Sequence, residues 1–123
     1  MQSDYQVVVI GGGVVGASVL YHLAKLGWTD VCLIERSVLT AGSSWHAAGG
    51  IHALNADPNM SALQAYTINL LAEIEQESGQ SIGLHMTGGI SVASTPDRWE
   101  WLQSAYRTYQ TVSIEDCYLM TPD

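Results

Sequence analysis

Basic residues are scarce in this sequence, and phenylalanine is missing altogether. Four lysine and arginine residues stand against twelve acidic ones, which leaves a formal net charge of −8 over 123 residues. A surface with this balance repels a phosphate backbone, so we expect no nucleic-acid partner. The two cysteines, Cys32 and Cys117, have neither C-x-x-C spacing nor a metal-ligand pattern around them. We therefore expect no disulfide framework, no metal site and a reducing compartment.

Long hydrophobic runs are also missing. No apolar stretch approaches the roughly 20 residues that a helix needs to span a bilayer, so we expect no membrane association. Residues 1–6 contain no basic segment and lead directly into an apolar run. This start predicts no secretory or mitochondrial leader and a cytoplasmic protein. Hydrophobic residues nevertheless make up 47% of the chain, which is enough for a folded core.

The spacing G-x-G-x-x-G follows the first apolar run. Val7–Ile10 is uniformly apolar, as in a parallel strand that is buried on both faces, and Gly11, Gly13 and Gly16 come after it. With this spacing, the first glycine allows a tight turn, the second lets a pyrophosphate approach the backbone, and the third lets a helix pack close to the strand. The segment predicts a phosphate site at the start of a helix, where backbone N–H groups and the helix dipole favour an anion.

The residues after the glycines support this interpretation. Apolar residues at helical spacing predict a helix from about Gly13 to Gly27, and a second apolar strand, Val31–Ile34, follows it. Glu35 ends that strand, nineteen residues after Gly16, where a carboxylate binds a ribose hydroxyl. The unit thus predicts a dinucleotide site and leaves NAD and FAD open. A glycine-rich turn in an unrelated βαβ unit is the alternative.

The remainder of the chain predicts a long loop and two helices. Residues 36–55 lack periodicity and are rich in small residues, which is typical of a functional loop. Asp57, followed by proline, predicts the start of a helix that ends at Gly79. Thr95, also followed by proline, predicts another helix. The apolar side of that helix consists of Trp99, Leu102, Tyr106 and Tyr109.

Short strands are expected in the second half of the chain. Leu84–Met86 and Ile90–Ala93 flank the turn sequence Thr87-Gly88-Gly89, which predicts a hairpin. A further strand is expected at Cys117–Leu119, and residues 121–123 repeat the cap-and-proline pattern of a helix start. Only two strands of a parallel sheet have been reached by then. The chain is therefore expected to be the amino-terminal, truncated part of a larger domain.

The loop after Glu35 carries a more specific pattern. The run Leu39-Thr40-Ala41-Gly42-Ser43-Ser44-Trp45-His46-Ala47-Ala48-Gly49 resembles the dimethylglycine dehydrogenase and sarcosine dehydrogenase family, part of the D-amino-acid oxidase superfamily of FAD-dependent oxidoreductases. Looser similarity continues through residues 75–80 and 87–93. The resemblance implies an α/β fold in which residues 1–56 form a Rossmann-like βαβ FAD-binding half with its flavin loop. Residues 57–123 would begin the substrate-binding part.

The resemblance also implies a set of cofactor residues. In the family, the histidine of the Trp-His-Ala-Ala-Gly motif carries the flavin covalently through the 8α-methyl group, and the matching residue here is His46. A neutral imidazole nitrogen is available as a nucleophile near pH 7. Together with the glycine motif, the expected FAD-binding residues are Gly11, Gly13, Val14, Val15, Gly16, Glu35, Arg36, Thr40, Gly42, Ser43, Ser44, His46, Ala47, Ala48 and Gly49.

The implied activity is FAD-dependent oxidative demethylation of a small N-methylated amine such as dimethylglycine or sarcosine, with hydride transfer to the histidyl-linked flavin. Tetrahydrofolate and an electron-transfer flavoprotein are implied partners of the complete enzyme. No residue here has the pattern of a substrate clamp or a general base, so no catalytic residue is assigned and the chain alone is expected to be inactive. An NAD-dependent dehydrogenase and a non-catalytic nucleotide-binding module remain alternatives.

Overall fold

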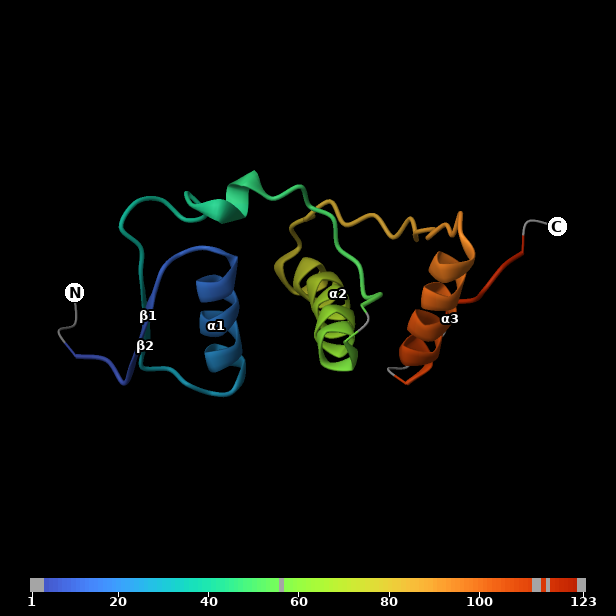
Figure 1. Ribbon diagram of the computed structural model, residues 1–123. Coiled ribbons are helices and arrows are strands. Elements are labelled where there is room, and N and C mark those ends of the chain that lie inside the picture. Colours follow the sequence, from blue (N-terminus) through green and yellow to red (C-terminus); the bar gives the residue numbers. More distant parts are fainter. Residues whose placement is uncertain (1–3, 56, 112–113, 115, 122–123) are drawn as a thin grey trace. The chain divides into compact units, whose positions relative to one another are not determined.

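The computed structural model describes residues 4–55, 57–111, 114 and 116–121. The chain divides into two compact units, which we call unit 1 (up to Gly50) and unit 2 (from Ile51), and each is described by itself. The order of elements is two strands around a helix, then a short 3-10 turn, then two longer helices (Figure 1). None of the helices in the described part of the chain is both long and apolar enough to cross a membrane.

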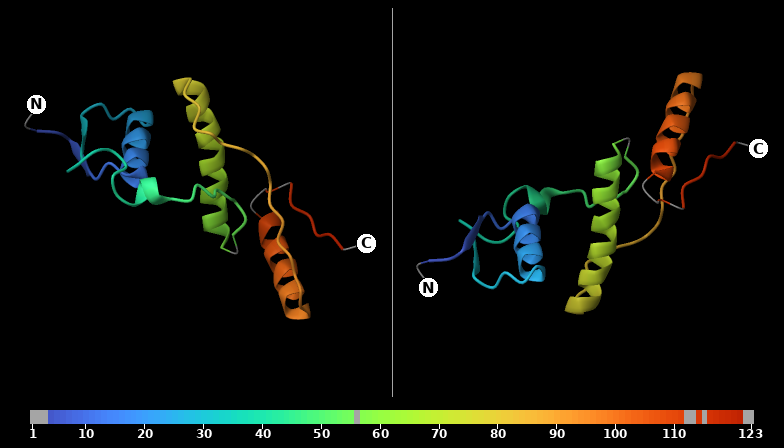
Figure 2. Two further views of the ribbon diagram at one scale, coloured as in Figure 1. Left: turned by 90° about the horizontal axis from the view of Figure 1, so that it is seen from above. Right: turned by 90° about the horizontal axis from the view of Figure 1, so that it is seen from below.

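Unit 1 is built on a βαβ crossover. Strand β1 (Val7–Ile10) and strand β2 (Val31–Ile34) pair in parallel, and helix α1 (Val14–Lys25) connects them. Figure 2 shows α1 alongside the two strands from two further sides, in agreement with its contacts to both. β-branched residues at most of the strand positions favour the extended backbone. The predicted strand, turn, helix and second strand are confirmed.

Helix α1 covers one face of this small sheet. Val9 points toward the helix and is 9% exposed. Successive strand residues point to opposite faces of a sheet. Val8 and Ile10 therefore lie on the other face, where Ile10 is 85% exposed. The expectation that the first strand is buried on both faces is thus wrong for the described residues. The reason is that, in the described part of the chain, a covering layer packs on one face of the sheet only.

Unit 2 contains two helices with the predicted starts. The Asp57 side chain accepts a hydrogen bond from the Met60 backbone N–H at 2.9 Å and begins α2 (Pro58–Ser78). Thr95 begins α3 (Pro96–Gln110) in the same way, through the Arg98 N–H at 3.3 Å. Helix α2 ends at Gly79, whose φ of 65° suits glycine. Both predicted helices are confirmed, and Trp99, Leu102, Tyr106 and Tyr109 are all at least half-buried.

The strands predicted in unit 2 are wrong. Residues 84–86, 90–93 and 117–119 have no strand structure, and Ile90 is 93% exposed. A strand needs a hydrogen-bonded neighbour, and β1 and β2 form the one sheet in the described residues. The helix start expected at residues 121–123 falls mostly on Pro122 and Asp123, which lie outside the described residues.

Candidate functional site

The turn between β1 and α1 requires glycine for different physical reasons at different positions. Gly11 has a φ of 108°, a conformation that residues with a side chain rarely adopt, and its N–H donates to the Ile34 carbonyl at 2.8 Å. A Cβ added at Gly16 would overlap the Gly11 carbonyl oxygen. Glycine at this position therefore lets α1 begin directly against the turn. A Cβ added at Gly13 would lie 3.0 Å from the Ser44 hydroxyl, so this glycine faces the loop that follows Glu35.

Glu35 is held by backbone N–H groups of the turn and of its own loop. One carboxylate oxygen accepts the Gly12 N–H at 2.7 Å, and the other accepts the Ser37 N–H at 2.9 Å. The Gly12 hydrogen bond, followed by that of Ser37, lowers the pKa of the Glu35 carboxyl below its ordinary value. The group is therefore a carboxylate at neutral pH. Its remaining lone pairs can accept hydroxyl donors such as those of a ribose.

Sequence reasoning missed Gly12 and Ser37. The G-x-G-x-x-G pattern leaves the second residue free, yet a Cβ at Gly12 would lie 2.7 Å from Leu39 Cδ2 and 3.0 Å from Glu35 Cβ. The available signal was that Gly12, at a position where the motif does not require glycine, completes a run of three glycines. Ser37 has no sequence signal, because its role is carried by its backbone N–H.

The loop after Glu35, residues 36–50, is joined to the glycine turn by hydrogen bonds. The Thr40 N–H donates to the Gly12 carbonyl at 2.9 Å, and the Val14 N–H donates to Ser44 Oγ at 2.8 Å. Thr40 has a φ of 66°, which is an unfavourable conformation for a β-branched residue. Contacts with the surrounding structure are needed to hold such a conformation. The structure thus brings Gly13, Val14, Glu35, Thr40 and Ser44 together around the start of α1.

His46 ends a short 3-10 turn, η1 (Ser43–His46), inside the expected loop. Its Nδ1 lies 3.1 Å from the Gly42 carbonyl oxygen, and its ring centroid lies 4.3 Å from that of Trp45. A carbonyl can only accept, so Nδ1 carries the hydrogen and, in the neutral ring, Nε2 keeps its lone pair. The other predicted residues of the loop and helix start lie at exposed positions of unit 1: Val15, Arg36, Gly42, Ser43, Ala47, Ala48 and Gly49.

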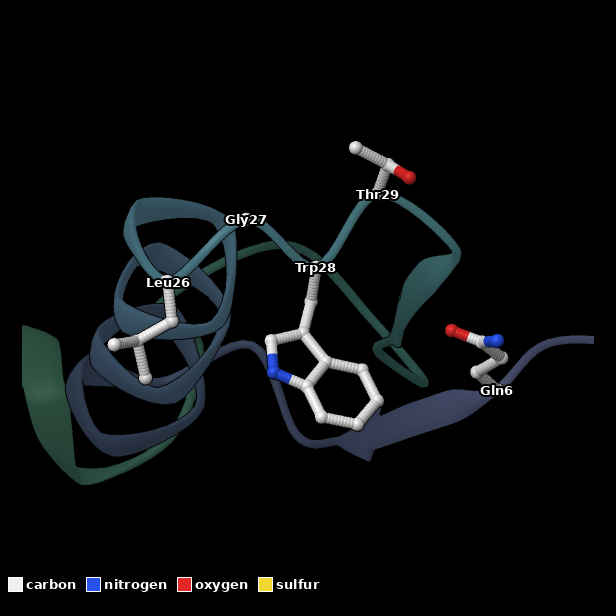
Figure 3. A pocket seen from close by; sticks show the side chains of 5 residues that line it. All are labelled: Gln6, Leu26, Gly27, Trp28 and Thr29. Carbon is white, nitrogen blue, oxygen red and sulfur yellow. The ribbon is translucent and has the colours of Figure 1, made fainter.

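A hollow elsewhere in unit 1 is a poor candidate for the site. It is lined by Gln6, Leu26, Gly27, Trp28 and Thr29, which Figure 3 shows. These residues precede the two strands or follow α1, so the hollow lies at the amino ends of the strands. Ligands of open parallel sheets bind at the carboxyl ends, where the glycine turn and Glu35 are.

The residues around the start of α1 fit a dinucleotide pyrophosphate. The first N–H groups of a helix have no partner within it, and the helix dipole favours an anion there. Gly13 has no side chain that would block a pyrophosphate from reaching the start of α1, and the neighbouring Glu35 carboxylate is an acceptor for hydroxyl groups. Among the residues that the structure describes, no three histidine, cysteine, aspartate or glutamate side chains come together as a metal site would require.

Comparison with known families decides which dinucleotide is involved. Residues 6–123 match the family described as FAD dependent oxidoreductase. The chain belongs to this family. Because the family is described as FAD-dependent, the match supports FAD and gives no support to the nicotinamide alternative.

Two of the curated relatives are named as dehydrogenases of dimethylglycine and of sarcosine. The chain is 47% identical over 93 residues to mitochondrial dimethylglycine dehydrogenase of Rattus norvegicus, covering 76% of this chain and 11% of that protein. It is 41% identical over 99 residues to mitochondrial sarcosine dehydrogenase of Homo sapiens, covering 80% and 11%. The chain thus spans about a tenth of the length of these curated relatives.

The fold also matches a solved structure. The crystal structure of L-proline dehydrogenase from P. horikoshii aligns with a TM-score of 0.83 at 23% identity, over 93% of this chain and 30% of that chain. At this identity the likeness concerns the fold alone. It agrees with the predicted α/β, Rossmann-like architecture, which is confirmed.

Proposed function

We propose that unit 1 is the FAD site of an enzyme that oxidises a small N-methylated amine, with the flavin attached to His46. The observation that supports this most is the joining of the His46 loop to the glycine turn through Gly12 and Val14. Relatives named for dimethylglycine, sarcosine and 4-methylaminobutanoate share an N-methylated amine as substrate. The substrate class of the proposal comes from these names.

Each part of the site has a separate role toward FAD. The first turn of α1 binds the pyrophosphate, because its N–H groups and dipole favour an anion. The Glu35 carboxylate accepts a ribose hydroxyl while Gly12 and Ser37 hold it in place. When bound, the flavin supplies the redox chemistry by accepting the equivalent of a hydride from the carbon next to the amine nitrogen.

His46 is suited to attachment by its tautomer. The Gly42 carbonyl holds the hydrogen on Nδ1, so Nε2 is the nucleophilic atom. Attachment would replace one C–H of the flavin 8α-methyl group and the imidazole N–H by a C–N bond. Dioxygen would take up the two hydrogens with their electrons as hydrogen peroxide.

The test uses the full-length polypeptide that contains this chain. Its absorption spectrum should be that of a flavin, and anaerobic addition of dimethylglycine or sarcosine should bleach it. After denaturation, flavin fluorescence should remain with the protein band on a gel and disappear in His46→Ala. The control His85→Ala, a histidine of unit 2, should retain it. A fluorescent band in His46→Ala would exclude the attachment.

A binding role without catalysis is the second candidate. The chain is 42% identical over 98 residues to the mitochondrial pyruvate dehydrogenase phosphatase regulatory subunit of Mus musculus, which is named for regulation. A protein of this kind would show the flavin spectrum without bleaching by any N-methylated amine. The same anaerobic titration therefore separates the two candidates.

A further inference from the structure

The loop that carries His46 is joined to the glycine turn by hydrogen bonds. A hydrogen bond from the Gly12 N–H to Glu35 holds the residue directly before the loop, and two more join the loop itself to the turn: Thr40 N–H to the Gly12 carbonyl, and Val14 N–H to Ser44 Oγ. The last of these is the closest in sequence to His46. Figure 1 shows the green-blue turn of η1 beside the end of α1 at which the helix begins.

Ser44 and His46 face different surroundings although they share one 3-10 turn. Ser44 is half-buried, and its hydroxyl accepts a hydrogen bond from the Val14 N–H and lies close to Gly13. Trp45 and His46, in contrast, are exposed. The Ala47 N–H closes the turn on the Ser44 carbonyl at 3.3 Å. A single 3-10 turn has poor intrinsic stability. Its orientation therefore depends on the contact that Ser44 makes with α1.

We infer that Ser44 is a positioning residue, which docks η1 on the first turn of α1 and so presents His46 for attachment to the flavin. The inference rests on the proposed function, because it concerns the same covalent bond. A serine hydroxyl suits this role, because it accepts the Val14 N–H and keeps its own O–H as a donor. Docking through Ser44 is therefore compatible with an anion bound at the same helix start.

The experiment measures the rate of covalent attachment separately from FAD affinity. Full-length apoprotein is mixed with saturating FAD, quenched in denaturant at intervals, and read by flavin fluorescence in the gel. Ser44→Ala should slow attachment about tenfold, as expected for the loss of one hydrogen bond. Affinity is measured in the His46→Ala background, where no bond forms, and Ser44→Ala should reduce it by a smaller factor.

Two further variants and one control isolate the hydroxyl group. Ser44→Thr keeps it and should attach flavin at close to the wild-type rate, whereas Ser44→Val has nearly the same shape as threonine without it and should be as slow as alanine. This pair decides the question where the alanine variant does not fold. Ser81→Ala is the control, because Ser81 also accepts a backbone N–H, from Gly83 at 3.3 Å, but belongs to unit 2. It should leave the rate unchanged.

The outcomes distinguish this inference from the proposed function. If wild-type protein links flavin and Ser44→Ala and Ser44→Val link it at the same rate, the inference fails and the proposed function stands. If wild-type protein links no flavin, both fail. A slow valine variant with a fast threonine variant supports the positioning role.

Discussion

Unit 1 and unit 2 differ in the kind of contact that stabilises each of them internally. In unit 1 the decisive hydrogen bonds join residues far apart in sequence, with separations of 23 for Glu35 and Gly12 and 30 for Ser44 and Val14. In unit 2 the helix starts are set locally, by side chains that bond three residues ahead. The comparison indicates that the proposed cofactor site depends on hydrogen bonds between the glycine turn and residues much later in the chain. Substitutions in unit 1 should therefore affect FAD binding, and those in unit 2 should affect local stability.

The largest effect is expected for Gly16→Ala. The added methyl group overlaps the Gly11 carbonyl, so α1 has to move away from the turn, at a cost of about 3 kcal/mol. Flavin retention by the full-length polypeptide should be lost, and hydrogen exchange in β1 and α1 should accelerate. Gly50→Ala is the matched control, because a Cβ there meets nothing within 4 Å and its φ is not positive. Normal FAD retention in Gly16→Ala would contradict this explanation of the turn.

Glu35→Gln should weaken FAD binding about tenfold at neutral pH, because a carboxylate is replaced by a weaker acceptor. The pKa of Glu35 is lowered by its hydrogen bonds to Gly12 and Ser37. Its contribution to folding stability is therefore fully present above the ordinary pKa of about 4.3 and is lost as the pH falls through the lower, folded-state pKa.

The pH dependence provides the check on Glu35. The difference in unfolding midpoint between wild type and Glu35→Gln should be constant above about pH 5 and shrink as the pH falls further. A difference that does not change with pH would show that the charge on Glu35 contributes nothing. Asp30→Asn, elsewhere in unit 1, tests whether any lost carboxylate has the same effect.

The same contrast explains what could be predicted from sequence. The βαβ unit followed from apolar runs, the glycine spacing and Glu35, and the helices of unit 2 followed from Asp57 and Thr95. These signals are local or belong to one compact motif. The three hydrogen bonds that hold Glu35 and the following loop on the glycine turn could not be predicted, because all three donors are backbone N–H groups, those of Gly12, Val14 and Thr40.

The failed strand predictions have the same cause. Residues 84–86 and 90–93 have strand-like composition, but composition does not supply a pairing partner, and the described residues contain none for them. Glycine-rich turns such as Thr87-Gly88-Gly89 are compatible with extended chain as well as with a hairpin. Local patterns therefore overestimated the regular structure of unit 2.

A smaller and local effect is expected for Asp57→Ala. Loss of the cap leaves the Met60 N–H without its acceptor and should destabilise the start of α2 by about 1 kcal/mol. Hydrogen exchange should accelerate in the first turn of α2, with FAD retention unchanged. Asp57→Asn should remain close to wild type, since asparagine caps about as well. A loss of flavin in Asp57→Ala would break the contrast between the units.

The smallest effect is expected for Arg98→Gln. The Arg98 guanidinium lies 3.8 Å from the centroid of the Trp101 ring, and Trp101 is 43% exposed. A cation–π contact at such a position contributes about 0.5 kcal/mol. Hydrogen exchange of α3 should change slightly, and Arg98→Lys should preserve part of the contact. A change above about 2 kcal/mol would indicate a role for Arg98 that this contact does not explain.

The most direct test of flavin attachment is the mass of the proteolytic peptide that contains His46, taken from the purified full-length polypeptide. We predict a peptide heavier by one FAD less two hydrogen atoms, with fragmentation placing the flavin on His46. An unmodified His46 peptide, or a flavin on another residue, would contradict the attachment.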